Sequence, residues 1–171
     1  MQQLCAFNEV LPIPHTNVRL NSSTWCAECD ISFLTGITKL SIKKMKNCAL
    51  TLPTSIRVLD MFSNTKGVTV SGTDNLTYLE VENESLITTP CPRLQEFVLR
   101  REMLSEMIIP GPIRDVTTLS RMFVRVDMVD RGFRFPPGLK ELHLDVRNDS
   151  IDNALLTPLT QLQRLEIDVI K

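Results

Sequence analysis

The stretch LTYLEV, at residues 76–81, follows the pattern L-x-x-L-x-L, in which x is any residue. Alternation of apolar and polar side chains at the end of this pattern is typical of a β-strand with one buried face. The pattern returns, with Ile, Met or Phe replacing some leucines, in five further clear copies: ITKLSI at 37–42, IRVLDM at 56–61, LQEFVL at 94–99, LKELHL at 139–144 and LQRLEI at 162–167.

The spacing of the copies is nearly constant. The early first positions lie at 37, 56, 76 and 94, which gives steps of 19, 20 and 18 residues. The gap from 94 to 139 has room for one more copy, and LSRMFV at 119–124 fills it, with IRDVTT at 113–118 as the alternative register. The segment HTNVRL at 15–20 can be read as a degenerate first copy. A period near 20 predicts a repeat architecture.

Prolines precede several copies by two to four residues, as Pro53, Pro92, Pro137 and Pro158 do. Proline fixes φ and lacks an amide donor, so it ends one segment and leads an extended chain into the next strand. All four prolines lie outside the L-x-L core of the copies, so they do not interrupt a central strand.

One copy supplies a single short strand and cannot bury its apolar side chains alone. Parallel stacking of neighbouring copies makes a continuous core, so the sequence predicts a solenoid. Copies this short leave little room for a helix opposite each strand, and we expect short or irregular segments there. Helices are predicted at 149–156, where Asp149 is a candidate N-cap, and at 102–109 before Pro110.

The repeats resemble those of leucine-rich-repeat proteins. The units LPTSIRVLDMFSN, at 52–64, and FPPGLKELHLDVRN, at 135–148, are similar to the short proline-bearing repeats of bacterial secreted effectors and of protozoan or FNIP-type proteins. Asn64 falls at the asparagine that follows the motif in that family, whereas most other copies carry a different residue there. The resemblance covers roughly residues 37–170 and implies an α/β solenoid with a curved parallel β-sheet.

Composition excludes several classes of function. The chain has 171 residues, 43% hydrophobic and 23% charged, which suits one soluble domain. Its formal net charge of −1 and aromatic content of 5% argue against nucleic acid and against a membrane surface as partners. Five cysteines, an odd number, argue against a full disulfide framework and favour a reducing compartment, so we expect a cytoplasmic protein.

The segment STWCAECD, at 23–30, contains a C-x-x-C pair. On a helical wheel Trp25, Cys26, Cys29 and Phe33 share one apolar arc, which predicts a capping helix over 25–34 that packs on the repeats. The chain is therefore divided into an N-terminal cap at 1–36 and repeats at 37–171, in one contiguous domain.

Two chemical hypotheses for the same C-x-x-C pair stay open beside the capping helix. A thiol–disulfide redox site would use Cys26 and Cys29, since a helix N-terminus lowers a thiol pKa. A zinc site would need four ligands, and Cys5, His15 and Cys48 are further candidates without a recognisable spacing. The sequence contains no hydrolase, phosphate-loop or metalloprotease motif, so we expect no enzyme activity, no metal and no cofactor.

Stacked copies turn sequence positions into columns, and the strand residues between the leucines should share one open, concave face. Charge along this face alternates in bands, first basic, then acidic, basic and acidic again, with apolar side chains among them. We predict a non-enzymatic protein-binding face built from twelve residues: Lys43, Asp60, Phe62, Glu80, Glu82, Val98, Arg100, Phe123, Arg125, His143, Asp145 and Glu166.

Lateral pairs such as Glu82–Arg100 and Arg125–Asp145 would instead make the same residues an ordinary solvated face. A further alternative is a structural or self-associating segment of a larger protein. The segment LEIDVIK, at 165–171, closes the sequence directly after a predicted strand, and we expect either chain continuation or contact with another chain at this edge.

Overall fold

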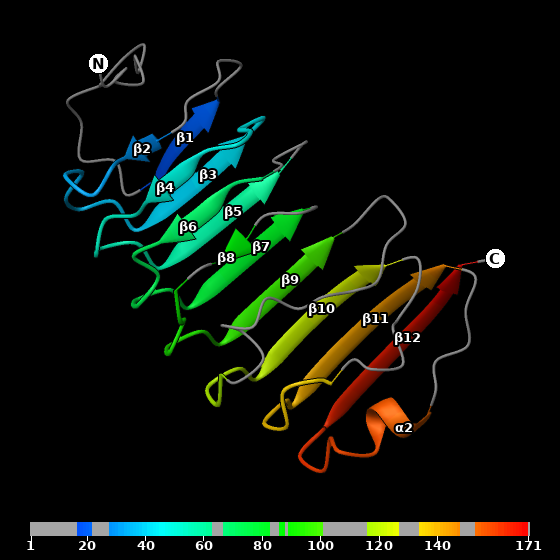
Figure 1. Ribbon diagram of the computed structural model, residues 1–171. Helices are drawn as coiled ribbons and strands as arrows, with labels where there is room; N and C mark the ends of the chain where they lie inside the picture. The colour runs from blue at the N-terminus through cyan, green and yellow to red at the C-terminus, as the bar shows by residue number, and fades with distance from the viewer. Residues whose placement is uncertain are drawn as a thin grey trace.

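The computed structural model describes residues 17–21, 28–62, 67–82, 86–87, 89–100, 116–126, 134–147 and 153–170. In these residues the chain winds into a solenoid of parallel β-strands, in which strands from successive turns lie side by side (Figure 1). The predicted stacking of parallel repeats is therefore confirmed.

The main sheet has eight strands, and each comes from one copy of the L-x-x-L-x-L pattern. The first strand, β1, comes from the degenerate copy, and β10 pairs with both neighbours in the 119–124 register, which confirms that register: Met122 lies opposite Phe97 and Leu142. All pairings are parallel, in the order β1 (Asn17–Asn21), β3 (Lys39–Lys43), β5 (Val58–Phe62), β7 (Tyr78–Glu82), β9 (Glu96–Arg100), β10 (Arg121–Val126), β11 (Glu141–Arg147) and β12 (Arg164–Ile170).

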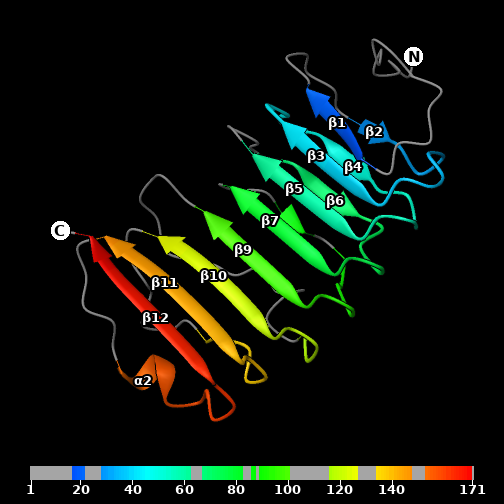
Figure 2. The same cartoon turned by 180° about the vertical axis from the view of Figure 1, so that it is seen from behind.

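A second, four-stranded parallel sheet lies beside the N-terminal half of the first (Figures 1 and 2). Its strands are only two or three residues long, and they are the short extended segments expected opposite each main strand. The sheet itself was not predicted from the sequence. Its strands are β2 (Glu28–Asp30), β4 (Ala49–Thr51), β6 (Thr69–Ser71) and β8 (Leu86–Ile87).

The predicted capping helix is wrong over the part of it that the structure describes. Glu28–Asp30 is strand β2, paired with β4, and Phe33 lies in the following turn with 64% of its surface exposed. Cys29 and Ile31 are buried and Asp30 between them is exposed, which is the two-residue period of a strand.

Helix is almost absent from the described residues. The one helix there is α2 (Asn153–Leu156), a single turn inside the predicted 149–156 segment. The helix predicted at 102–109 lies outside the described residues. The fold is thus a parallel β-solenoid, and the α/β character implied by the leucine-rich-repeat resemblance is not established.

The core lies between the two sheets and continues along the inner face of the main sheet. In β3 the leucine positions Leu40 and Ile42 are fully buried, and Leu50 and Val70 of the second sheet are buried too. Phe97 of β9 is the largest of the fully buried side chains. Each copy therefore buries its apolar side chains only through its neighbours, as a stacked repeat requires.

A recurring turn feeds each main strand. The amide of Ile56 donates to the carbonyl of Pro53 at 3.2 Å, and the amide of Leu139 donates to that of Pro136 at 3.3 Å. The same bond recurs from Leu76 to Thr73 at 3.0 Å. Pro53 and Pro136 hold the first position of this turn, and Pro92 and Pro137 hold the second, where the fixed φ of proline suits a turn.

Hydroxyl and amide side chains satisfy turn carbonyls across successive coils. Thr118 Oγ1 donates to the carbonyl of Leu94 at 2.7 Å, and Thr73 Oγ1 donates to that of Pro90 at 2.9 Å. Asn75 Nδ2 donates to the Thr54 carbonyl at 2.9 Å. These side chains stabilise the coils at places other than the asparagine position of the family pattern, and Asn64 itself lies outside the described residues.

Candidate functional site

The outer face of the main sheet, defined as the face opposite the leucine rows, carries the predicted binding residues. Phe123 lies opposite Val98 on one side and His143 on the other, and His143 lies opposite Glu166. Arg100 likewise lies opposite Glu82 and Arg125, and Arg125 lies opposite Asp145. The predicted residues thus form two columns across the strands, one through Phe123 and one through Arg125. The structure places both columns on one face and in the predicted order.

A third column on this face, at the residue just before the second leucine of each copy, was largely missed from the sequence. The strand alternation that identified the other columns was signal enough to find it. Its members are Lys39, Val58, Tyr78, Glu96, Arg121, Glu141 and Arg164.

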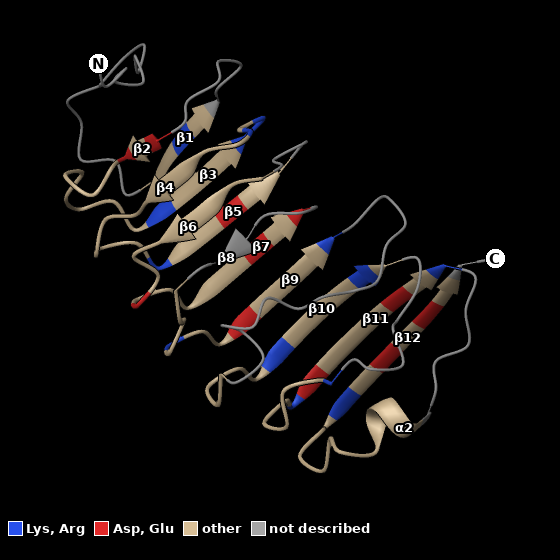
Figure 3. Cartoon of the chain, viewed as in Figure 1, with Lys and Arg blue, Asp and Glu red and all other residues tan. Residues whose placement is uncertain are grey.

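Ion pairs join the charge bands across neighbouring strands, as the alternating colours of Figure 3 suggest. Lys39 Nζ lies 2.9 Å from Asp60, and Arg121 lies 2.6 Å from Glu96. The expected Arg125–Asp145 pair is present. Arg100 lies 2.8 Å from a carboxylate oxygen of Glu80, a diagonal neighbour, rather than pairing directly across the strands with Glu82.

Several of the predicted binding residues are buried, three of them beneath these ion pairs. Asp60, Glu80 and Asp145 are 4%, 8% and 3% exposed, and Val98 is 5% exposed. Tyr78 donates its hydroxyl hydrogen bond to Glu80 at 2.8 Å, and burial together with this acceptor raises the pKa of Tyr78. These four side chains therefore offer a partner little surface, and their part in binding stays a prediction.

A stack of partly exposed side chains lies where basic and acidic bands meet. The ring of His143 stacks on Phe123 with centroids 4.4 Å apart, and the Arg100 guanidinium lies 5.5 Å from the Phe123 centroid. We call Arg100, Phe123 and His143 the aromatic stack. Arg100 keeps 50% of its side-chain surface exposed and His143 keeps 24%, so the stack is accessible to a partner. Lys43 lies over Phe62 in a similar way, at 5.9 Å.

A small depression of about 220 Å³ adjoins the aromatic stack. This volume is below the range of roughly 300–1,000 Å³ that encloses drug-sized ligands, so the depression suits a protruding side chain better than a small molecule. Besides Phe123 and His143 it is lined by groups of both charges and two leucine-row residues: Glu96, Arg121, Met122, Glu141, Leu142, Arg164 and Glu166.

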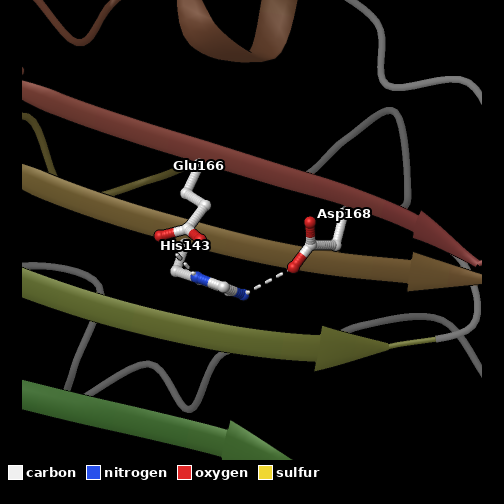
Figure 4. A group of neighbouring side chains, drawn as sticks. All are labelled: His143, Glu166 and Asp168. Carbon is white, nitrogen blue, oxygen red and sulfur yellow. Dashed lines mark ion pairs between the residues drawn. The ribbon is translucent and has the colours of Figure 1, made fainter.

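His143 lies between two carboxylates of β12 (Figure 4). Its Nδ1 is 3.2 Å from Glu166 and its Nε2 is 3.5 Å from Asp168. These are donor types that a divalent cation uses, and the ligand atoms lie within 4.8 Å of one another. The carboxylates approach different ring nitrogens, however, so the donors do not converge on one point. The geometry is that of a histidine in contact with two separate carboxylates. The expected absence of a metal therefore stays a prediction.

The described thiols are buried in the core. Burial, with the neighbouring Asp30 charge, raises the pKa of Cys29. Burial, with Cys29 and Glu28 nearby, raises the pKa of Cys48 to about 11. Redox chemistry needs a lowered thiol pKa at an accessible site, so the state of Cys29 disfavours the redox hypothesis. Cys26, its partner in the C-x-x-C pair, lies outside the described residues.

No family model, curated protein or solved structure matches the chain in the comparisons with known proteins. Within the described residues, no helix is both long enough and apolar enough to cross a membrane. The case for a function therefore rests on the surface of the chain itself.

Proposed function

We propose that this protein is a non-enzymatic protein-binding module and that the aromatic stack is the centre of its binding surface. The observation that supports this proposal most directly is the stacking of Arg100, Phe123 and His143 on three neighbouring strands. Their side chains are partly exposed on the outer face. Arginine and aromatic side chains are enriched among the few residues that dominate interface energies. Strands hold these side chains more rigidly than loops do, so little entropy is lost on binding.

The surrounding ion pairs support the choice of this centre. Along much of the face, charges are matched by an oppositely charged neighbour, as in Lys39–Asp60 and Arg121–Glu96. Arg100 also pairs with Glu80, but it keeps half of its side chain exposed and lies over an aromatic ring, so it still presents a charged surface to a partner. The adjacent depression can accept one side chain of the partner. We therefore expect a protein segment that presents an apolar or aromatic residue to Phe123 and a carboxylate to Arg100. Neither nucleic acid nor a membrane surface is expected to bind.

The proposed location is the cytoplasm. Cys29, Cys48 and Cys91 are free thiols in the described structure, and thiols persist in reducing compartments. A partner from the same compartment is the natural first candidate for a binding assay.

The test is a comparison of surface variants in quantitative capture experiments with the whole chain. Phe123→Ala and Arg100→Ala should each lower the affinity for a genuine partner by about five- to thirtyfold, as truncation of a side chain at an interface centre does. The matched controls Phe33→Ala and Arg93→Ala remove the same side-chain types from exposed turns and should leave affinity unchanged.

Circular dichroism and thermal unfolding of each variant separate loss of binding from loss of fold. Affinities of the captured partners are then measured by calorimetry. If every captured partner binds Phe123→Ala and Arg100→Ala as tightly as the unaltered chain, the aromatic stack is not the binding centre.

A further inference from the structure

The strand β12 forms one end of the main sheet and exposes apolar side chains at positions that the strands β3 to β11 of this sheet bury. Leu165, Ile167 and Val169 are 44%, 39% and 53% exposed. Their neighbours in register on β11 are at most 1% exposed: Leu142, Leu144 and Val146. No described residue pairs with the free edge of β12. An unpaired edge of this length with an apolar row is a template for another strand.

The strand β1 forms the other end of the sheet and carries the complementary pattern. Val18 and Leu20 hold the leucine-row positions of its copy, and Arg19 lies between them on the outer face. Inside the sheet, each copy pairs with the next at equivalent positions, as Leu142 does with Leu165. A second copy placed past β12 in the same register would set its Val18 opposite Leu165, its Leu20 opposite Ile167 and its Arg19 opposite Glu166.

We propose that β12 of one molecule pairs in parallel with β1 of a second copy, so that the solenoids stack end to end in the register of their own repeats. The pairing sets Val18 and Leu20 beside Leu165 and Ile167, two of the three exposed apolar residues of β12. It also sets the Glu166 carboxylate against the Arg19 guanidinium, which repeats the acid–base matching of Arg125 and Asp145 within the sheet. This surface is separate from the proposed function of the aromatic stack.

Charge also argues against the simplest alternative, a two-fold dimer of antiparallel β12 strands. The register with the greatest overlap is centred on Ile167 and sets Glu166 of each copy opposite Asp168 of the other. Like charges directly opposite each other destabilise a strand pair. Parallel stacking onto β1 avoids this repulsion and gains an attraction.

The two arrangements differ in how mass grows with concentration. End-to-end stacking is heterologous, so each added copy exposes a new β12 edge and the assembly lengthens without closing. A two-fold dimer stops at two copies. Sedimentation velocity of the whole chain over a wide concentration range should show mean mass rising beyond that of a dimer. A monomer at every concentration, or a mass that stops at the dimer, overturns the proposal.

A charge swap tests the register. Glu166→Lys and Arg19→Glu should each weaken self-association by about tenfold, because each sets like charges opposite one another. An equimolar mixture of the two variants restores matched pairs at both junctions and should recover the assembly of the unaltered chain. The control Asp74→Lys makes the same change of charge in an exposed turn outside the main sheet and should have no effect.

Glu166→Lys also removes the contact with His143, so circular dichroism must show that this variant folds. Ile167→Lys supplies a second, charge-independent perturbation of the edge, with Phe33→Lys as its exposed apolar control. Ile167→Lys should weaken association at least tenfold. Undiminished assembly of Ile167→Lys, or failure of the charge-swapped mixture to recover assembly, would show that β12 does not pair with β1 as proposed.

Discussion

Removing Arg125 from its ion pair with Asp145 should destabilise the protein much more than removing Asp145 does. Asp145 is almost fully buried, with 5% of its side-chain surface exposed, whereas Arg125 keeps 44%. One carboxylate oxygen accepts from Arg125, and the other, Oδ1, finds no hydrogen-bond partner among the described residues. The informative perturbations are therefore Arg125→Met and Asp145→Leu, each alone and then together.

The magnitudes follow from what each change leaves behind. Arg125→Met leaves a buried carboxylate with neither oxygen paired. Breaking a fully buried pair costs about 3–5 kcal/mol, and solvent around the half-exposed arginine lowers this to about 2–3 kcal/mol. Asp145→Leu leaves a guanidinium that water can solvate and also removes the unpaired oxygen, so it should cost less than about 1 kcal/mol. The double variant should be close to neutral, as apolar replacement of buried ion pairs often is.

Urea unfolding followed by circular dichroism gives the free energy of unfolding of all four chains, and a double-mutant cycle gives the coupling between the two positions. The sign of the asymmetry is the decisive result. If Asp145→Leu destabilises the protein as much as Arg125→Met does, then Asp145 is not a buried charge that depends on its partner. The reasoning from burial would then be refuted.

Gly72→Ala should destabilise the fold by about 1–3 kcal/mol, measured by urea unfolding, because Gly72 has φ of +77° and a Cβ there would lie 2.8 Å from the Leu52 carbonyl oxygen. Gly36→Ala, at φ +84° with open space around it, should cost less. Stability should fall as pH rises from about 9 through 11: the unfolded thiol of Cys48 ionises first, near 9.0, and the folded one near 11, so alkali favours unfolding. Tyr78 acts in the same direction above 10. The buried thiols of Cys29, Cys48 and Cys91 should react with maleimide at neutral pH only as fast as the protein unfolds. Labelling at each site is followed by mass spectrometry, and fast labelling would contradict their burial.

The main sheet was predictable because its signal is repeated. Each copy places two buried residues two positions apart, and the near-constant period sets one strand beside the next. This alternation also favoured the 119–124 register over the alternative at 113–118, and the pairing of β10 confirms it. The second sheet gives no comparable signal, because β2 and β4 each bury only one residue, Cys29 or Leu50. The helical wheel failed over 28–34, the described part of its range, for the same reason, since a three-residue strand cannot outweigh apolar residues that happen to fall on one arc.

The membership of the candidate site was predictable, but its accessibility was not. Strand alternation assigns Asp60 and Glu80 to the outer face, and a residue on an outer face is ordinarily exposed. Their burial depends on long side chains of neighbouring strands, Lys39 over Asp60 and Arg100 over Glu80. Such cover is set by the rotamers of residues about 20 positions away, which no single copy of the repeat encodes.

Cross-strand matching explains why the two proposed surfaces lie where they do. Within the sheet, several acidic residues pair with a basic residue on a neighbouring strand, as Asp60 does with Lys39 and Asp145 with Arg125, and such pairs have less capacity to attract a partner. At the aromatic stack Arg100 pairs with Glu80, lies over the Phe123 ring and still keeps half of its side chain exposed, and the matching ends at β12, beyond which no further strand is described. A solenoid that satisfies its charges internally should bind other molecules where this internal matching is incomplete.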